Sequence, residues 1–494
     1  MTPTYYLACD LGLDRGRILL GTLNRAQLSL QEIASFPIRP QATNAVSTPD
    51  LAELEKHIFA AIAQAAALDL PISGLSATSW DGDYVLLDGK DRPLTTPTGK
   101  KRPATTSDRL LKKLPMAAIY AETGIPLMPL HTLFQIDAEH FADPALFQRA
   151  ERFLPIADYL NTRFSGVAAC EESLASTTQL FNPQTHAWSP KLFAALDLPG
   201  SMAPRLVPSG TAIGPVVDEL RKHPALLNAR VVATCSHARA AAIAAIPSRS
   251  EQAWAFLHSD LRSQFGVELT EPILSSQACD DGFTNEVGLG GSIHLLRNSP
   301  GLSLLEGCKH AWASVGQIYT DEQLIRMATG VSPSHINPDD LRFRDPANML
   351  DEIAGFCRET GQLVPLKPGE FVRVVLESLA LAHGETLQRL EALTRTQMDV
   401  LHIIGRGAQN ELLNQLTADA TNLPVLAGPE DAAAIGNVLI QALALWQLRS
   451  PDHLRSIVAS SFPTRILKPG HTFDRRTRDK FRALCEVQAA AVAA

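Results

Sequence analysis

The sequence predicts an α/β fold with two domains, and three observations support this prediction. The first forty residues contain three strand-like segments joined by short turns, which is the pattern of an antiparallel meander. Segments with helical and strand periodicity then alternate along the chain. After residue 231 the opening theme returns, because a second strand-turn-strand unit follows there.

The elements of the first half follow from their periodicity and turn residues. Meander strands are expected at 5–10, 16–23 and 28–36, with Gly12, Gly16 and Asn24 in the turns. A helix is expected at 51–67, followed by a compact apolar-polar stretch at 72–79 and a strand at 84–87. Further helices are expected at 108–123, 131–140 and 156–164, before a stretch rich in Pro and Gly at 199–215.

The second half repeats part of this order. A strand at 231–234 and an Ala-rich helix at 237–245 precede strands at 254–257 and 265–269, whose polar turn corresponds to the turn at 10–16. A long helix at 370–393, a buried strand at 400–404 and helices at 410–421 and 432–448 follow. The basic residues at 475–480 share a short amphipathic segment, which is typical of a solvated helix face.

Length and charge limit the domain number and the partners. A chain of 494 residues accommodates two large domains, and we expect domains at 1–245 and 246–450 with a tail at 451–494 that packs back on the body. A composition with 45% hydrophobic residues predicts a large core. The formal charge of -8 opposes nonspecific attraction to nucleic acid or to an anionic membrane, so neither is an expected partner.

Cysteine usage and the N-terminus favour a cytoplasmic protein. The seven cysteines are scattered, with no CxxC pair and no cluster at metal-ligand spacing. The first residues lack the basic stretch and long apolar core of a signal peptide. The most apolar later segment, 432–448, is shorter than the about 20 apolar residues that span a bilayer, and is predicted to be a buried helix.

Five segments carry a resemblance that covers nearly the whole chain. They are Asp10–Arg17, Trp80–Asp88, Ala175–Leu180, Phe283–Glu286 and Asn410–Ala420. With the repeated turn, they make the chain similar to the FGGY carbohydrate kinases and, within these, to the rhamnulokinases. The resemblance implies a two-domain actin-like ATPase (ribonuclease H-like) fold with an interdomain cleft. It assigns the sugar to the domain at 1–245 and the nucleotide side to the domain at 246–450.

The resemblance also implies the position of the catalytic base. The family transfers the γ-phosphoryl group of Mg-ATP to a sugar hydroxyl, and an Asp at the start of the central helix accepts the hydroxyl proton. Here that position holds Ala238, between His237 and Arg239. A methyl group accepts no proton, and loss of a general base typically costs about 10²- to 10⁴-fold in rate. No intact catalytic residue is therefore expected.

Ionised side chains stand in the turns that the resemblance assigns to the phosphates. In the first turn and its flanks, the implied nucleotide contacts are Asp10, Gly12, Asp14, Arg15, Gly16 and Arg17, with Asp10 also organising Mg-bound water. Asp260 and Leu261 replace a Gly and a Thr of the second turn, and Arg406 stands between Gly405 and Gly407 in the third. Repulsion between unit charges 4 Å apart costs about 1 kcal/mol in water and about 4 kcal/mol at an effective dielectric of 20. We therefore expect ATP to bind poorly.

The new charges have opposite signs. Our hypothesis is that Asp14 or Asp260 pairs across the cleft with one of four arginines, namely Arg15, Arg239, Arg262 and Arg406. The alternative is that each of these side chains points to solvent, where a pair would contribute only about 0 to 1 kcal/mol.

On the sugar side, the resemblance implies substrate contacts by Trp80, Asp83, His237 and Asn298. The family's Trp-Gly-Val-Asp becomes Trp80-Asp81-Gly82-Asp83, and His131 replaces an Asn near the pocket. The alternatives are that Trp80 is a core residue, Asp83 an ordinary strand-end carboxylate and His131 a helix-start residue.

Together these observations predict a pseudokinase that binds a small sugar or an anionic ligand. One alternative is an active carbohydrate kinase with a shifted substrate and a different base, and another is a regulatory or scaffold protein of sugar catabolism. Mg-ATP is the expected cofactor if the protein is active, and none is expected otherwise. A homodimer is also expected.

Overall fold

A computed structural model describes residues 2–38, 50–95, 107–128, 130–248, 251–328, 330, 334–471 and 473–493. The chain divides into two compact units. The first comprises Met1–Pro247, Glu268–Leu295 and Asp431–Phe462, and the second comprises Ser248–Val267, Leu296–Glu430 and Pro463–Ala494. Each unit thus combines distant segments, whereas the sequence-based division uses contiguous ranges. Both contain strands and helices, which confirms the predicted α/β class.

The first unit is built on a six-stranded sheet with the order β11-β12-β4-β1-β2-β3. These strands are β1 (Thr4–Leu11), β2 (Arg15–Asn24), β3 (Gln27–Pro37), β4 (Ile72–Thr78), β11 (Thr211–Pro215) and β12 (Arg230–Ala233). Strands β1, β2 and β3 pair antiparallel, which confirms the predicted meander, while β4 pairs parallel with β1 and with β12. Strand β1 is buried from Tyr6 to Leu11, as expected for a central strand covered on both faces.

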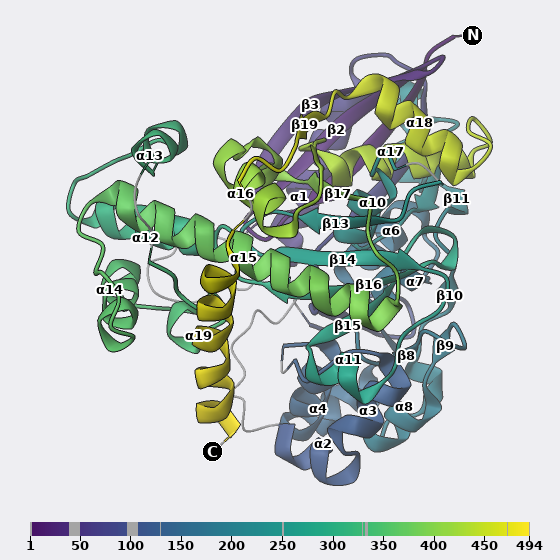
Figure 1. The fold of residues 1–494 in the computed structure, drawn as a ribbon. Helices are drawn as coiled ribbons and strands as arrows, with labels where there is room; N and C mark the ends of the chain where they lie inside the picture. The colour runs from purple at the N-terminus through teal and green to yellow at the C-terminus, as the bar shows by residue number, and fades with distance from the viewer. Residues whose placement is uncertain are drawn as a thin grey trace. The chain divides into compact units, whose positions relative to one another are not determined.

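The helices that pack on this sheet include α1 (Leu51–Ala66), α6 (Ile156–Ser165), α17 (Ala432–Ala444) and α18 (Pro451–Ser461), and α10 (Ala238–Ala244) packs against α17 (Figure 1). Helix α17 is the predicted buried helix. It lies so close to α10 that a Cβ atom on Gly436 would be 1.8 Å from the carbonyl oxygen of Ala241. The Gln441 side chain donates to the carbonyl of Leu7 at 3.0 Å, which satisfies a backbone group in the interior.

The rest of the first unit consists of short elements. They are β5 (Tyr84–Leu87), α2 (Ser107–Lys113), α3 (Met116–Thr123), α4 (Thr132–Ala142), α5 (Pro144–Arg149), β6 (Arg152–Pro155), β7 (Cys170–Glu171), α7 (Glu172–Ser176), β8 (Phe181–Asn182), β9 (Ala187–Trp188), α8 (Pro190–Ala195), β10 (Leu206–Val207), α9 (Asp218–Arg221), α11 (Ser276–Asp280) and β15 (Phe283–Val287). The single helix predicted at 108–123 is wrong, since Pro115 separates α2 from α3. Proline lacks the N–H that a continuous helix would need there.

In the second unit, strands lie in the order β14-β13-β17-β18-β19, and β16 lies next to β14. Their bounds are β13 (Trp254–His258), β14 (Ser263–Leu269), β16 (Ile293–Ser299), β17 (Val400–Ile404), β18 (Val425–Ala427) and β19 (Arg465–Leu467). Strands β13 and β14 form the predicted antiparallel hairpin, and β17 runs parallel to β13.

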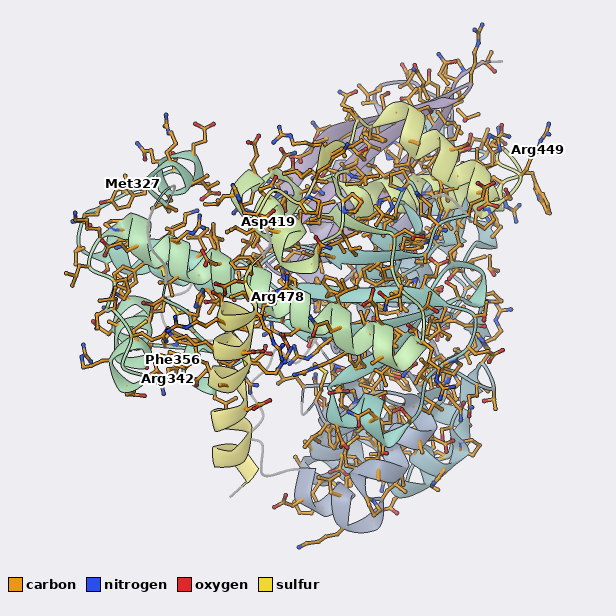
Figure 2. All side chains as sticks on the ribbon, in the orientation of Figure 1. Met327, Arg342, Phe356, Asp419, Arg449 and Arg478 are labelled. Carbon is orange, nitrogen blue, oxygen red and sulfur yellow. The ribbon has the colours of Figure 1, made fainter. Side chains whose placement is uncertain are left out.

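The helices of the second unit are α12 (Ser303–Ser314), α13 (Asp321–Ala328), α14 (Met349–Glu359), α15 (Pro368–Thr394), α16 (Glu411–Thr421) and α19 (Arg475–Ala493). The long helix α15 packs against α13 and α16, and its predicted position is confirmed (Figure 1). The guanidinium of Arg342 lies 5.3 Å from the ring centre of Phe356 on α14, within cation–π range (Figure 2).

The tail is divided between the two units. Helix α18 is part of the first unit, where the Leu28 N–H donates to the hydroxyl of Ser461 at 2.8 Å. Strand β19 and α19 are part of the second unit, where the Gly470 N–H donates to the carboxylate of Asp419 on α16 at 2.7 Å (Figure 2).

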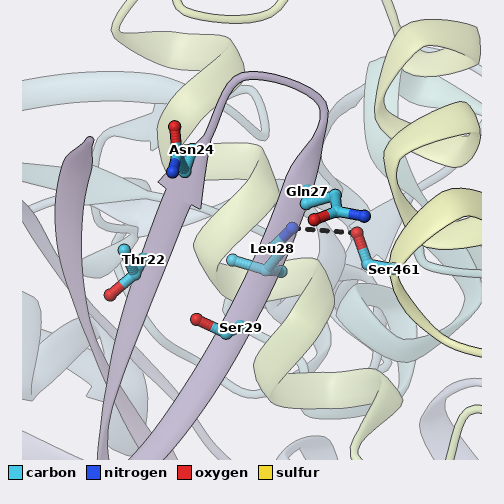
Figure 3. Close-up of a pocket in the computed structure, with 6 residues that line it drawn as sticks. All are labelled: Thr22, Asn24, Gln27, Leu28, Ser29 and Ser461. Carbon is cyan, nitrogen blue, oxygen red and sulfur yellow. Dashed lines mark hydrogen bonds between the residues drawn. The ribbon is translucent and has the colours of Figure 1, made fainter. Parts of the chain in front are cut away.

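A polar hollow of about 310 Å³ lies where the β2–β3 hairpin meets α18 (Figure 3). It is lined by Thr22, Asn24, Gln27, Leu28, Ser29 and Ser461. None of these residues belongs to the predicted site. Across the described ranges, no helix combines the length and the hydropathy that crossing a membrane requires.

Candidate functional site

The turn between β1 and β2 is closed by its own backbone. The N–H of Gly12 donates to the carbonyl of Arg15 at 3.0 Å, so this amide is already bonded within the turn. Leu13 packs against the core of the first unit, and Asp14 is exposed. Arg15 pairs with Glu32 on β3 at 2.8 Å, with both side chains largely exposed. Exposed pairs of this kind contribute little stability.

Asp10 is held by a partly buried ion-pair chain that ends at the more exposed Asp431. Its carboxylate lies 2.7 Å from Arg17, whose other terminal nitrogen lies 2.8 Å from Asp431. Burial lowers the pKa of Arg17, but the charges and hydrogen bonds of Asp10 and Asp431 outweigh this and raise it. Gly16 is required by packing, because a Cβ atom there would lie 2.3 Å from the ring of Phe36. Arg17 therefore engages the carboxylate predicted to organise Mg-bound water, and that role stays a prediction.

Trp80 and Asp83 are joined by a buried hydrogen bond. The indole N–H donates to the Asp83 carboxylate at 2.8 Å, and Trp80 is a member of the hydrophobic core. Between them, Gly82 has a φ of +90°, a conformation that favours glycine. The positive φ of residue 82 thus explains why this chain has a glycine at position 82. The core location favours the structural alternative for Trp80, and substrate contact by either residue stays a prediction.

The start of α10 lies directly beside the segment that carries these residues. The Ser79 N–H donates to the carbonyl of Ser236 at 2.9 Å, and the Ala238 N–H donates to the carbonyl of Ser79 at 3.0 Å. His237 precedes the first helical residue and is almost completely buried. These bonds join Ala238, at the position of the family's base, to Ser79, which lies two residues before Asp81.

Three charged side chains meet at this place, and we call Asp81, Arg239 and Glu286 the buried triad. One terminal nitrogen of Arg239 lies 2.9 and 3.1 Å from the two carboxylate oxygens of Glu286 on β15, and the other lies 3.8 Å from Asp81. His237 lies 3.5 Å from Glu286 through Nδ1. Burial raises the pKa of Glu286, while Arg239 opposes this increase. Side-chain exposure is 13% for Arg239, 5% for Glu286 and 34% for Asp81, so Asp81 is the most accessible member.

His131 lies beside the buried triad, directly before α4 as predicted for a helix-start residue. The residue is only 6% exposed, and its Nδ1 finds no hydrogen-bond partner within the described ranges. Burial lowers the pKa of His131, the nearby Asp81 carboxylate opposes this shift, and Arg239 adds to it. A neutral imidazole is thus favoured here.

Two buried carboxylates support the segment that leads into α10. Glu171 accepts a hydrogen bond from the Ser236 N–H at 2.7 Å, and Asp158 accepts one from the Ser236 hydroxyl at 2.7 Å. Burial, followed by the charge of Glu171, raises the pKa of Asp158 to about 8. Burial also raises the pKa of Glu171. These two carboxylates therefore fix the backbone and side chain of Ser236, which leads into α10.

The turn between β13 and β14 in the second unit is occupied by its own carboxylate. Asp260 accepts a hydrogen bond from the Leu261 N–H at 2.8 Å through its side chain, and its carbonyl accepts one from the Leu302 N–H at 2.9 Å. Arg406 approaches the Asp260 carboxylate to 4.0 Å, with side-chain exposures of 65% and 36%. The amide of Leu261 is therefore satisfied by an internal anion.

The third turn packs against the second. Gly405 has a φ of +84°, and a Cβ atom on Gly407 would lie 1.9 Å from the Ser259 hydroxyl. The Gly407 N–H donates to the carbonyl of Ser259 at 2.9 Å. Both glycines are thus needed for contact between the turns, while the Arg406 side chain lies largely in solvent.

Three of the arginines in the charge-pair hypothesis, Arg15, Arg239 and Arg406, have carboxylate partners inside one unit. Arg239 is one of the four arginines of that hypothesis, and Glu286 and Asp81 hold it inside the first unit. The physical reason is that a buried guanidinium requires adjacent carboxylates. Arg406 approaches Asp260 within the second unit, not between units. The general pairing across a cleft stays a prediction.

Two other predicted site residues lie at different depths in the structure. Arg262 is exposed, and Asn298 is partly buried on β16. Sequence reasoning missed Glu286 as a member of the site, although it quoted the segment that contains it. The available signal was a run of three polar residues in one short strand, Thr284, Asn285 and Glu286, which are all buried on β15.

Comparisons with known proteins give consistent results. The N-terminal domain model of the FGGY family of carbohydrate kinases matches residues 5–244, and its C-terminal domain model matches 263–445. A rhamnulokinase of Bacteroides thetaiotaomicron is 34% identical over 94% of this chain and 96% of its own length. A rhamnulokinase of Bacillus subtilis is 33% identical over 96% of both chains.

Solved structures share the fold at low identity. A gluconate kinase from Lactobacillus acidophilus has a TM-score of 0.80 at 14% identity, with 100% of this chain and 99% of that chain covered. A Plasmodium falciparum glycerol kinase with ADP has a TM-score of 0.77 at 13% identity, with 99% and 98% covered. These similarities confirm the predicted actin-like ATPase fold.

Proposed function

The chain belongs to the FGGY family of carbohydrate kinases, and we propose that it is a rhamnulokinase-like member whose ATP-dependent phosphoryl transfer is lost or severely weakened. The family reaction would phosphorylate a ketose such as L-rhamnulose. Similarity to rhamnulokinases over nearly the whole chain supports a sugar as the ligand. Ala238 at the position of the family's base supports the loss of turnover.

The observation that carries this proposal is the hydrogen bond between the Asp260 carboxylate and the Leu261 N–H. A phosphate that used this amide would have to displace the carboxylate, and hydrogen bonds to charged groups contribute about 1.5–3 kcal/mol. Repulsion between the displaced carboxylate and the phosphate would add to this cost. Arg406 is too exposed to offset it, since exposed pairs contribute about 0 to 1 kcal/mol.

The residues of the first turn also fit Mg-ATP poorly. The Gly12 amide is bonded to Arg15 inside the turn, and the Asp10 carboxylate is bonded to Arg17. The described residues contain no group of three or more His, Cys, Asp or Glu side chains arranged to hold a metal ion. Magnesium often needs only one or two carboxylates, so the occupied amides are the stronger argument.

The sugar side supports retained ligand binding. The buried triad and the Trp80–Asp83 pair keep polar groups in a fixed arrangement beside α10. Such an arrangement, with charged groups held by neighbours, is typical of a binding site that does not depend on the nucleotide turns.

The test is coupled ADP release over a panel of ketoses, together with calorimetric titration of Mg-ATP. We expect turnover below about 1 s⁻¹, the lower end of the kinase range. Asp260→Gly should tighten Mg-ATP binding by about tenfold, because it frees the Leu261 amide and removes a negative charge. Asp351→Asn, an exposed carboxylate in the first turn of α14, is the matched control and should change nothing. Turnover above about 1 s⁻¹ would exclude the proposal.

A second candidate is an active carbohydrate kinase with a different base. The observation that favours it is the proximity of the accessible Asp81 carboxylate to the start of α10. In that case Asp81→Asn should abolish a substantial turnover that the unmodified protein shows. The first candidate predicts no such turnover to lose.

We further propose a cytoplasmic location, supported by seven cysteines that are all free thiols. Homodimer formation, a small sugar or anionic ligand, and the lack of nucleic-acid and membrane partners also stay predictions.

A further inference from the structure

Asp81 and Arg239 are two departures from the resembled family that meet in space. The motif of the resembled family has Gly at the position of Asp81, and Arg239 directly follows the position that the resemblance assigns to the base. Their side chains approach to 3.8 Å, although the residues are far apart in sequence. Opposite charges that enter a buried region together compensate each other, so we treat the two residues as one functional pair.

Glu286 fixes one member of the pair. Arg239 contacts both carboxylate oxygens of Glu286, and a charge-assisted contact of this kind restricts the guanidinium. Arg239 and Glu286 are nearly inaccessible, whereas a third of the Asp81 side chain is exposed. Asp81 is therefore the member that a ligand can reach.

An independent observation at the same place points to a ligand. The Nδ1 atom of His131 has no hydrogen-bond partner within the described ranges, although only 6% of the residue is exposed. The next residue, Thr132, donates from its hydroxyl to the carbonyl of Gly82 at 3.0 Å, which holds the His131 segment against the Asp81 segment, and His131 interacts electrostatically with Asp81 and Arg239. Buried polar atoms are nearly always bonded, so an unbonded one needs an explanation. A ligand hydroxyl next to Asp81 would supply the missing partner.

The charge of this region selects the class of ligand. Asp81, Asp83 and Glu286 contribute three carboxyl groups, and Arg239 contributes one guanidinium. Burial favours neutral His131, so the imidazole does not add a positive charge. An anionic ligand would face excess negative charge at low effective dielectric. A ligand with hydroxyl donors and no charge would not.

We propose that Asp81, positioned by Arg239, accepts a hydrogen bond from a hydroxyl of an uncharged sugar and makes the site reject anionic sugars. The proposal rests on the sugar-binding part of the proposed function and decides between its two ligand classes. This choice is a real one for the fold, since a gluconate kinase shares it.

The test is calorimetric titration without nucleotide, using two pairs of probes: L-rhamnulose with L-rhamnonate, and D-xylulose with D-gluconate. In the unmodified protein, the neutral member of at least one pair should bind at least about tenfold more tightly than its anionic partner. One lost charge-assisted hydrogen bond corresponds to about tenfold or more in affinity. Asp81→Asn should therefore weaken neutral binding by about tenfold and reduce the discrimination, while the exposed control Asp69→Asn should do neither.

Arg239→Lys separates positioning from charge. It keeps the positive charge but has only one nitrogen, which cannot face both Glu286 and Asp81 as the two terminal nitrogens of Arg239 do, so the neutral probe should bind more weakly while discrimination remains. Thermal melting of each variant shows whether it is folded, and the comparison of probe charges needs no variant. Equal or tighter binding of the anionic probes, or unchanged affinity in folded Asp81→Asn, overturns this inference alone. Failure of all four probes to bind the unmodified protein overturns it together with the sugar-binding part of the proposed function.

Discussion

Removing Arg239 should destabilise the first unit strongly, and more so at alkaline pH. In Arg239→Met, the Glu286 carboxylate would lose its two hydrogen bonds from Arg239, at 2.9 and 3.1 Å, while its side chain stays only 5% exposed. Breaking a buried pair by removing one partner costs about 3–5 kcal/mol. The remaining exposure of Arg239 and protonation of Glu286 favour the lower end, about 3 kcal/mol. This corresponds to a loss of roughly 6–12 °C in Tm, at about 2–4 °C per kcal/mol.

The pH dependence follows from the direction of the Glu286 pKa shift. Burial already raises the pKa of Glu286, and the loss of Arg239 would raise it further, because Arg239 opposes the shift. The folded state then holds a proton that the unfolded state releases above its own pKa of about 4.3. Stability therefore falls as pH rises from this value towards the folded-state pKa. The Tm deficit of Arg239→Met should be larger at pH 8 than at pH 5.

The assay is thermal melting of the two proteins in matched buffers between pH 5 and pH 8. Arg15→Met is the control, because it removes an arginine from the exposed pair with Glu32 and should cost only about 0 to 1 kcal/mol. The reasoning would be refuted if Arg239→Met lowered the Tm by no more than Arg15→Met does across this pH range.

Three further perturbations have expected outcomes. Burial and the charge of Glu171 raise the pKa of Asp158 to about 8, so the stability of the folded protein should decline from about pH 4 to pH 8. Asp158→Asn should flatten this decline in denaturation experiments across the same pH range. An unchanged slope would argue against the raised pKa. Gly436→Ala should destabilise by more than about 3 kcal/mol, because the new methyl group would overlap backbone of α10, whereas Gly355→Ala in α14 has room and should change stability by no more than about 1 kcal/mol; similar melting of both variants would contradict the packing. Ala238→Asp should fail to restore normal turnover in the coupled ADP assay, since the phosphate turns stay altered, and complete rescue by this change alone would show that the turns are competent.

Local patterns were sufficient for most of the fold. The strands at 84–87 and 400–404 lie where their apolar runs predicted them. The antiparallel meander was predictable because Gly and Asn between the first strands indicate tight turns. The helix at 108–123 failed because its apolar period continues across Pro115, where the backbone cannot. The region after residue 300 carries α12, α13 and α14, which the sequence analysis did not assign.

The candidate site was less predictable, because charge pairing depends on contacts between distant segments. The resemblance placed Ala238 and Asp260 in their motifs, but motif position does not say which partner a charge will find. The partners of Arg239 were not identified, since nothing local shows that β15 brings Glu286 beside α10. The bond from Leu261 to the Asp260 carboxylate likewise depends on the turn's conformation, which residue types alone leave open.

The most direct measurement for the central claim is a crystal structure determined with a non-hydrolysable ATP analogue, magnesium and L-rhamnulose. The account predicts that the Leu261 N–H still donates to the Asp260 carboxylate and that no ordered triphosphate lies against this turn. A well-ordered triphosphate that accepts the Leu261 N–H, with its terminal phosphorus facing a sugar hydroxyl, would contradict it.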